Sequence, residues 1–464
     1  MSSDLLLKNI YHLVSRPGQD ARLRGVDLLV SGGIVKQIGE QIDAPAARVI
    51  DASTKLVFPG LVNTHHHMYQ SMTRCLPAVQ NAELFDWLVG LYPVWSKLGQ
   101  EALEVATQLC CAELLKSGCT ATFDHHYLFS PSLPSEALAA QVSAATATGI
   151  RFCVSRGSMS RGKSQGGLPP DSVVQDEQEI LEASERLIAE HHDADANSMV
   201  RVALAPCSPF SVTDRLMERS AELARRYGVK LHTHLAETAD EERYCQQTYG
   251  CRPLALMERL GWLGEDVWFA HGVHFDDAEL DQLAATRTGI AHCPTSNMRL
   301  GSGFARVTEM IGRGVRVGLA VDGCASNDSS NMLAELRNCL LLHRVKHGAA
   351  AIDVHQVFDL ATRGSADLLG WSELGTLEVG KPADLVLVEM DRLDYVGALS
   401  DPLAAVVFCG LSQEVHSVIV NGRLVVDDGR LTAIDEQALR REGNRQARAL
   451  LERAGVETRW YLDV

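Results

Sequence analysis

The chain carries Asn63-Thr64-His65-His66-His67-Met68-Tyr69-Gln70 directly after the apolar run Leu56-Val57-Phe58-Pro59-Gly60-Leu61-Val62. A short apolar run bounded by polar residues is typical of a buried strand. Side chains two apart on a strand share a face, so His65 and His67 are predicted to project together from the strand end. Neutral imidazole is the commonest protein ligand for zinc and related metals. The segment therefore predicts half of a metal site.

Later apolar runs also end in side chains that bind metals or transfer protons. They are Lys230-Leu231-His232-Thr233-His234-Leu235-Ala236-Glu237-Thr238, Ala270-His271-Gly272 and Val317-Gly318-Leu319-Ala320-Val321-Asp322. If these strand ends meet, they bring together three imidazoles and one carboxylate, from His65, His67, His234 and Asp322. This donor set suits Zn²⁺, with Fe²⁺ as the second choice.

Three residues are predicted to move protons beside that metal. A metal of this kind lowers the pKa of bound water, so that hydroxide forms near neutral pH. Asp322 can act as the general base that takes the proton from this water. Glu237 can protonate a substrate nitrogen and relay the proton to a leaving amine. His271 can donate to, or polarise, the attacking oxygen, and the set as a whole predicts hydrolytic attack on a trigonal carbon.

Between residues 59 and 374, apolar runs alternate with helical patterns. Predicted strands end near Thr64, His125, Ser155, Pro206, His234, His271, His292 and Asp322. Helices are predicted over 101–116 and 213–227, and a third begins with a capping box, Thr238-x-x-Glu241. Eight such units in about 300 residues predict a (β/α)₈ TIM barrel, with a doubly wound sheet as the alternative. The barrel is favoured because barrel enzymes keep their chemistry at the C-terminal strand ends.

Residues 1–58 and 375–435 are predicted to form one split β-sandwich that brackets the barrel. A hairpin signal lies between apolar runs in each segment, Gly32-Gly33 in the first and Asn421-Gly422 in the second. Residues 436–464 are predicted to form a helical C-terminal tail, which ends with Trp460-Tyr461 before the last residues. The tail either packs back on the barrel or serves a partner subunit.

Composition restricts the partners of the chain. The net charge is −16, whereas nucleic acids and anionic membranes are bound by basic faces. The N-terminus lacks the features of a signal peptide, and no apolar run reaches membrane-spanning length. The twelve cysteines include no C-x-x-C pair, which favours reduced and mostly buried thiols. We therefore expect a cytoplasmic protein without nucleic-acid or membrane partners.

The order His65-x-His67, His234-x-x-Glu237, His271 and Asp322 resembles the amidohydrolase superfamily. Within it, the chain is most similar to the mononuclear aromatic deaminases, which include guanine deaminase, S-adenosylhomocysteine deaminase and the triazine hydrolases. The resemblance spans essentially the whole chain, including Gly380-Lys381-Pro382-Ala383-Asp384-Leu385. It implies a single metal ion, because residues 201–207 lack the bridging lysine of dinuclear members. It also implies a small aromatic heterocycle as substrate and a homo-oligomer.

The resemblance further implies substrate contacts from Gln70, Trp87, Arg156 and Cys207. Guanine deaminases have a glutamine at the spacing of Gln70, and its amide can both donate to and accept from a purine lactam edge. Trp87, or else Tyr92, can stack on a purine face. Cys207 stands where relatives place a substrate-contacting arginine or histidine, which argues against plain guanine as the substrate.

Four segments most resemble the 8-oxoguanine deaminases, whose products are uric acid and ammonia: 69–74, 84–88, 155–160 and 166–171. The rivals on the same scaffold are a deaminase of isoxanthopterin or another purine or pterin, and a triazine hydrolase. A catalytically dead interaction scaffold is a different class, but it should have lost ligands that this chain keeps. The glycine-rich stretch 157–167 lacks a phosphate-cradle motif and is a candidate lid.

Overall fold

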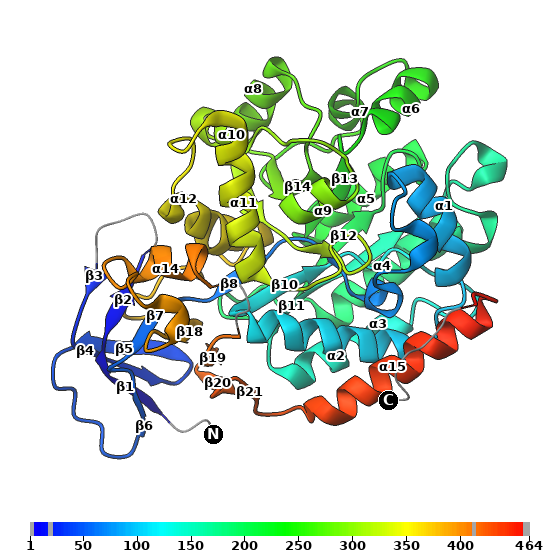
Figure 1. Ribbon diagram of the computed structural model, residues 1–464. Coiled ribbons are helices and arrows are strands. Elements are labelled where there is room, and N and C mark those ends of the chain that lie inside the picture. Colours follow the sequence, from blue (N-terminus) through cyan, green and yellow to red (C-terminus); the bar gives the residue numbers. More distant parts are fainter. Residues whose placement is uncertain (1–3, 17–21, 411–413, 458–464) are drawn as a thin grey trace.

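A parallel eight-stranded sheet forms the centre of the computed structural model, which describes residues 4–16, 22–410 and 414–457. The strand order is β16-β15-β14-β13-β12-β11-β10-β8. Figure 1 labels the strands of this sheet from β8 to β14 at the centre of the molecule. The bounds are β8 (Leu61–Asn63), β10 (Cys119–Asp124), β11 (Arg151–Ser158), β12 (Val200–Pro206), β13 (Lys230–Leu235), β14 (Val267–His271), β15 (Gly289–His292) and β16 (Arg316–Leu319). Every neighbouring pair is parallel, as the predicted βα units require.

The first and last strands of this sheet meet. The short strand β9 (His66–His67) pairs in parallel with β17 (Asp322–Gly323), directly beyond β8 and β16. Below them the Thr64 N–H donates to the Leu319 carbonyl at 3.2 Å. The sheet is therefore a (β/α)₈ barrel rather than an open doubly wound sheet, and the predicted fold class is confirmed.

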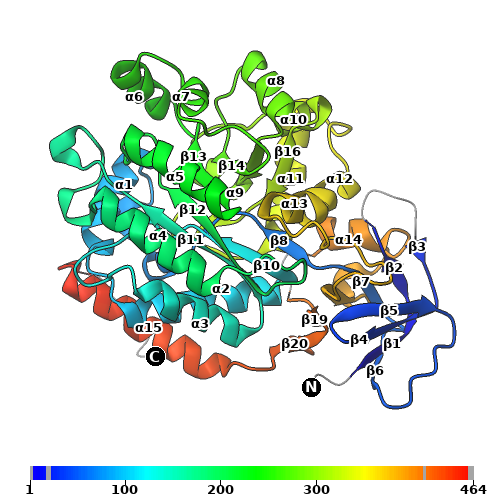
Figure 2. The same ribbon diagram turned by 180° about the vertical axis from the view of Figure 1, so that it is seen from behind.

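Helices surround the barrel on its outside (Figures 1 and 2). The bounds are α1 (Leu84–Trp95), α2 (Gln100–Lys116), α3 (Ala137–Thr148), α4 (Glu177–His191), α5 (Asp214–Tyr227), α6 (Ala239–Tyr249), α7 (Pro253–Arg259), α8 (Asp277–Thr286), α9 (Pro294–Arg299), α10 (Val307–Arg313), α11 (Met332–His347), α12 (Val354–Asp359) and α13 (Ser365–Leu369). Short helical turns include η1 (Met68–Thr73), η3 (Lys163–Gln165) and η5 (Leu360–Gly364). The predicted helix 213–227 matches α5, which Thr213 caps and Gly228 ends at φ 69°.

Two further sheets come from the chain ends. One has the order β5-β4-β1-β6 and the other β21-β20-β19-β18-β7-β2-β3. The bounds are β1 (Leu5–Ile10), β2 (His12–Val14), β3 (Arg22–Leu23), β4 (Val26–Ser31), β5 (Ile34–Gly39), β6 (Arg48–Asp51), β7 (Lys55–Pro59), β18 (Leu385–Glu389), β19 (Ser417–Val420), β20 (Arg423–Asp427) and β21 (Arg430–Leu431). Leu7, Leu28, Val57, Leu385 and Ile419 share one buried core between the two sheets. This is the predicted sandwich, because β7 from the first segment pairs with β18 from the second.

Both predicted hairpins are present in these sheets. Gly32 and Gly33 join β4 to β5 with φ angles of 62° and 82°, and Asn421 and Gly422 join β19 to β20 with 47° and 73°. Two consecutive positive φ values are the mark of the type I′ turn, whose twist matches that of the flanking strands.

The apolar run 56–62 is not the single strand that its pattern predicts. Its first part is β7, in the sandwich, and its last part is β8, in the barrel. The chain changes sheet at Gly60, where a Cβ atom would lie 2.1 Å from the Thr120 hydroxyl oxygen. Both halves are buried on both faces, so their hydrophobicity is continuous although their partners differ.

The C-terminal helix α15 (Glu436–Arg453) lies along α2, on the outside of the barrel (Figures 1 and 2). The ammonium group of Lys116 contacts the Glu436 carboxylate at 2.7 Å, and Leu450 is buried. This part of the predicted tail therefore packs on its own chain. Trp460 and Tyr461 lie outside the described residues. Among the described helices, none has both the length and the apolar character required to cross a membrane.

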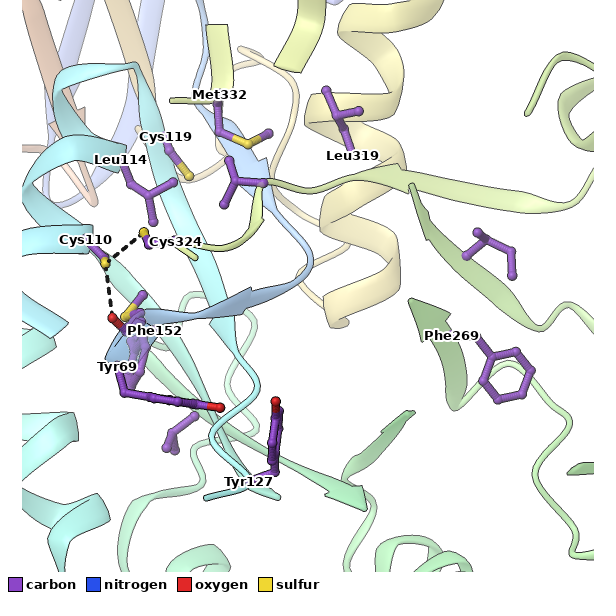
Figure 3. Packing of buried hydrophobic residues seen from close by; sticks show 14 of the residues in the cluster. Tyr69, Cys110, Leu114, Cys119, Tyr127, Phe152, Phe269, Leu319, Cys324 and Met332 are labelled. Carbon is purple, nitrogen blue, oxygen red and sulfur yellow. Dashed lines mark hydrogen bonds between the residues drawn. The ribbon is translucent and has the colours of Figure 1, made fainter. Parts of the chain in front are cut away.

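The cysteines are all free, and most of them are buried. Figure 3 shows one contact in the core, where Cys110 Sγ lies 3.6 Å from Cys324 Sγ and 3.5 Å from the Met68 carbonyl oxygen. A disulfide requires a sulfur separation of about 2.05 Å, so this contact is a hydrogen bond between thiols. The absence of a disulfide framework agrees with the spacing of the cysteines in the sequence.

Candidate active site

Four predicted ligand side chains meet at the C-terminal mouth of the barrel. Asp322 Oδ1 lies 3.2 Å from His65 Nε2 and 3.4 Å from His67 Nε2. His67 Nε2 lies 3.0 Å from His234 Nε2. Ligand atoms held at about 2.0–2.1 Å by a tetrahedral ion are about 3.3 Å apart, so these separations suit one shared ion. The residues come from β9, β13, β17 and the link before β9, which are distant in the sequence.

The outer nitrogens of two of these histidines bond to backbone carbonyls. His67 Nδ1 donates to the carbonyl of His125 at 2.7 Å, and His234 Nδ1 donates to that of Cys207 at 2.6 Å. A carbonyl can only accept, so each Nδ1 carries the ring proton and each Nε2 presents a lone pair to the site.

The tautomer of His65 is set through a second histidine. His232 Nδ1 donates to the Trp268 carbonyl at 2.9 Å, so His232 Nε2 must accept. His65 Nδ1 lies 2.8 Å from that nitrogen and therefore donates to it. His65 Nε2 is consequently a lone pair aimed at the site, and it is buried without a hydrogen-bond partner. His232 lies in the stretch 230–238 that carries His234, but no local sequence pattern predicts its orienting role.

Burial determines the charge of these groups. It lowers the pKa of His65 and of His67 to about 3, so both rings are neutral, as metal ligands must be. Burial alone would raise the pKa of Asp322, but His65, His271 and His67 together hold it well below its usual range. The site therefore combines neutral imidazoles with an ionised carboxylate. His125 adds a further buried imidazole close to His65, His67 and His234.

The predicted proton-transfer residues face the same point. Glu237 Oε2 lies 3.5 Å from His271 Nε2, which lies 4.0 Å from Asp322 Oδ2. Burial raises the pKa of Glu237 to about 7, with a contribution from Asp322 and an opposing one from His271. His271 is oriented by a 2.9 Å hydrogen bond between its Nδ1 and Asn297 Oδ1, a contact that the sequence does not predict. His271 and Asp322 both have positive φ, at 72° and 63°, and such strain is concentrated at functional sites.

The start of α6 differs from the predicted capping box. Thr238 caps the helix by accepting from the Glu241 N–H at 3.4 Å. The Glu241 side chain does not return to Thr238; it accepts from the N–H groups of Ala236 and Glu237, each at 2.9 Å. Its two oxygens bond instead to the N–H groups of the turn that precedes the cap, where Ala236 has a φ of 53°.

These groups border a small cavity at the mouth of the barrel. Its walls are largely apolar and aromatic, as is usual for small-molecule sites. They include Leu84, Trp87, Leu88, Tyr92, Tyr127, Phe210 and Leu300, with the polar Gln70, Cys207 and Ser326. Three of the residues for which substrate contacts are predicted therefore line this cavity: Gln70, Trp87 and Cys207. No lysine or arginine is among the described lining residues.

Gln70 and Trp87 both pack against the loop that follows β17. Gln70 Oε1 accepts from the Ala325 N–H at 3.4 Å, and Trp87 Nε1 donates to the Ala325 carbonyl at 3.2 Å. Gly323 is required here, because a Cβ atom at that position would lie 1.9 Å from Gln70 Oε1. Ser326, from the same loop, donates to Asp322 Oδ2 at 3.1 Å. This loop therefore joins the carboxylate to the cavity wall.

Arg156 lies away from the cavity. Its guanidinium group donates to Gln175 Oε1 at 2.8 Å and to Ser135 Oγ at 3.1 Å, and it stacks 4.0 Å from the centre of the Phe129 ring. The side chain is buried. The family resemblance implied a substrate contact for Arg156, but the residue is not among those that line the cavity, and β11 continues past it to Ser158. The stretch 157–167 also lies outside the described cavity lining.

Two tyrosines line the cavity in ways that the sequence only partly predicts. Tyr92 is buried, and its hydroxyl has no hydrogen-bond partner. Tyr127, two residues beyond the strand-end His125, stands edge-on to His67 with ring centres 5.1 Å apart. Figure 3 shows the hydroxyls of Tyr69 and Tyr127 turned toward each other. The histidines at the end of β10 indicate that this part of the chain lies near the site. No local sequence pattern predicts that Tyr127 lines the cavity.

Comparison with known proteins agrees with this geometry. The model of the amidohydrolase family matches residues 56–425. The chain belongs to the amidohydrolase family. An 8-oxoguanine deaminase from Pseudomonas aeruginosa is 46% identical to it, over 96% of this chain and 98% of that protein. An isoxanthopterin deaminase from an unknown prokaryote is 34% identical over 94% of each chain.

Solved structures of amidohydrolases extend the comparison. The crystal structure of atrazine chlorohydrolase from Arthrobacter aurescens, complexed with zinc, superposes with a TM-score of 0.91 at 30% identity. It covers 96% of this chain and 100% of that one. The chain is thus a metal-dependent enzyme of the amidohydrolase family, and the predicted resemblance is confirmed.

Proposed function

We propose that the protein is a zinc-dependent deaminase that converts 8-oxoguanine to uric acid and ammonia. The observation that carries this proposal is the small cavity without a lining lysine or arginine, which has a histidine–carboxylate cluster and a buried glutamate at one side. The relative with 46% identity bears the name of this activity. The cavity contains the groups that hydrolytic removal of an amine requires.

The donor set fits a single zinc ion. His65, His67, His234 and Asp322 would hold it, because three neutral Nε2 atoms and a carboxylate oxygen converge and His65 Nε2 has no other partner. Fe²⁺ is the second choice for the same ligands. Bound zinc would supply a water molecule whose pKa lies near neutral.

The side chains of the protein carry the protons of the reaction. Asp322, held by Ser326, takes a proton from the attacking water. The raised pKa of Glu237 lets it protonate the ring nitrogen next to the carbon under attack and then pass a proton to the departing amine. The C–O bond forms first, while the ring C=N bond becomes a single bond and its nitrogen takes the proton. The C–N bond to the amine then breaks, and the amine leaves as ammonia with that bonding pair and a proton that came from the attacking water. His271, fixed by Asn297, faces the attacking oxygen.

The cavity favours an uncharged bicyclic ring. Without a lining lysine or arginine, it offers no partner for a phosphate or carboxylate group. Gln70 provides an amide for a lactam edge, and Trp87 provides a flat surface. Burial raises the pKa of Cys207 to about 12, so that its thiol is neutral at the position where the family resemblance implies an arginine or histidine in relatives. Tyr92 adds an unpartnered hydroxyl, and these neutral groups suit the additional carbonyl of an oxidised purine.

Ammonia release from the zinc-loaded protein tests this proposal. The substrates are 8-oxoguanine, guanine, isoxanthopterin and a chlorinated triazine, with uric acid measured in parallel. We expect one uric acid and one ammonia per 8-oxoguanine consumed, and slow release from guanine. Release from isoxanthopterin alone would move the substrate to the pterins, and inactivity toward all four would contradict a purine deaminase.

A further inference from the structure

The carboxylate of Glu241 lies beneath the turn that carries Glu237. Its side chain is fully buried, with none of its surface exposed. One oxygen accepts from the Ala236 N–H at 2.9 Å and the other from the Glu237 N–H at 2.9 Å. A buried carboxylate destabilises a protein unless it is hydrogen-bonded. Both oxygens of Glu241 meet this need through backbone N–H groups of one turn. The group does not line the cavity.

The other side of the same turn is held by the next barrel strand. The Ala236 carbonyl accepts from the N–H groups of Val273 at 2.8 Å and His274 at 2.9 Å, just beyond β14. Ala236 itself has a φ of 53°, which a residue with a Cβ atom rarely adopts. The left-handed turn is therefore hydrogen-bonded on both sides, by Glu241 at its N–H groups and by the segment after β14 at its carbonyl.

This arrangement exceeds what the helix end requires. A glutamate at the third helical position normally accepts from the N–H of the capping residue. Glu279 does this in α8, where it accepts from the Asp276 N–H at 2.9 Å. Glu241 occupies the same position in α6, yet it bonds one and two residues before the cap. It thus fixes the backbone of Glu237 rather than the helix terminus.

We infer that Glu241 is a positioning residue, which sets the placement of the Glu237 carboxylate relative to His271 and to the reacting carbon. This inference rests on the proposed proton-transfer role of Glu237. Glu237 Oε2 lies 3.5 Å from His271 Nε2, and the two residues leave adjacent strands, so a shift of the turn changes that distance directly. Misplacement of about 1 Å can reduce turnover about 100-fold.

Glu241→Gln tests the inference with almost no change in volume. Its amide retains one accepting oxygen but places an NH₂ group against a backbone N–H, so one of the two bonds is lost. We expect kcat to fall by about 10- to 100-fold, the range typical of orienting contacts. KM and the zinc content should stay unchanged, because the substituted group touches neither substrate nor metal ligand. Glu241→Asp keeps the charge but draws it back from the turn, and kcat should fall in the same range.

Glu279→Gln is the matched control. It changes the same residue type at the same helical position, in the adjacent βα unit, where the residue is 8% exposed. We expect it to lower the melting temperature and leave kcat unchanged. A normal kcat in folded Glu241→Gln and Glu241→Asp, or an equal loss of kcat in Glu279→Gln, would overturn the inference.

The failure of the proposed function gives a different result. If Glu237→Gln retains full turnover, then Glu237 is not the proton carrier and the basis of the inference is removed. If Glu237→Gln is inactive while both Glu241 variants turn over normally, only the positioning role of Glu241 is wrong. Folding of each variant is checked by its melting temperature and by zinc analysis before kinetics are measured.

Discussion

The histidines of the predicted metal site are oriented by the hydrogen bonds of their outer nitrogens. His67 and His234 each donate to a carbonyl, and His65 donates to His232, which in turn donates to Trp268. Local spacing predicts the ligands themselves, because two residues on one strand face share a direction. It does not predict the orienting partners, since these come from neighbouring strands.

His65→Ala tests the ligand assignment. The change removes one of the converging Nε2 atoms and leaves a small buried void, so zinc affinity should fall by several orders of magnitude while the barrel still folds. Metal analysis of dialysed protein is the measurement. Full zinc occupancy of the variant would mean that His65 is not a ligand.

Glu237→Gln separates proton transfer from metal binding. The glutamine occupies the same space but cannot donate an acidic proton, so turnover should fall by at least about 100-fold, the range of general acid–base contributions. Zinc content should remain at the wild-type level, because Glu237 is not in the ligand set. Single-turnover kinetics with matched zinc analysis would check this, and normal turnover would refute the role.

Tyr92→Phe tests the unpartnered hydroxyl of the cavity. Because this hydroxyl bonds to no described protein group, its removal should not lower the melting temperature. If it binds a substrate oxygen, KM should rise about tenfold, the equivalent of one hydrogen bond of about 1.4 kcal/mol. Tyr69→Phe is the control, since that hydroxyl is also unpartnered but Tyr69 does not line the cavity. Equal effects of the two changes would contradict the assignment.

The positions of the residues in the candidate site depend on where the barrel strands end. β13, β14 and β17 each bring a side chain of the candidate site to the mouth. Positive φ occurs at Ala236 just after β13, at His271, the last residue of β14, and at Asp322, the first residue of β17. Strand ends were predictable from apolar runs that stop at polar residues. The split of residues 56–62 between two sheets was not, because hydrophobicity reports burial and not the identity of the paired strand.

Gly60→Ala tests the change of sheet at that position. The added Cβ atom would lie 2.1 Å from the Thr120 hydroxyl oxygen and 2.3 Å from its methyl group, so the sandwich and barrel strands must move apart. We expect the free energy of unfolding to fall by about 1–3 kcal/mol, as for overpacked cores. Gly39→Ala, where the added atom meets nothing within 4 Å, should change it little. Chemical denaturation of both variants is the measurement, and equal stabilities would contradict the account.

Glu335 on α11 gives the protein a pH-dependent element. Burial raises its pKa from about 4.5 to about 7, although Thr295 and Asn327 donate to it. The folded state therefore binds more protons than the unfolded state between these values, and stability from this group falls as pH rises through the window. In Glu335→Gln this loss should disappear. Relative to the wild type, the free energy of unfolding of the variant should therefore be higher at pH 8 than at pH 5. A difference between the two proteins that is the same at both pH values would contradict the prediction.

At the scale of the molecule, the chain ends close into a sandwich beside the barrel, and α15 runs back along α2. The barrel, the sandwich and their hairpins follow from alternating patterns and turn residues, which are local signals. The cavity walls do not, because they bring Trp87 of α1 together with Cys207 and Phe210 of the segment after β12. Arg156 shows that resemblance of a segment does not fix the direction of a side chain. A substrate contact is predicted for it, but its side chain is buried among Phe129, Ser135 and Gln175.

The most direct test of the central claim is a zinc titration of metal-free protein, with uric acid formation from 8-oxoguanine as the readout. One ligand set of three imidazoles and one carboxylate predicts that the rate rises linearly and reaches its plateau at one zinc ion per chain. Full turnover without metal, or a plateau that requires two ions per chain, would contradict a single-metal deaminase.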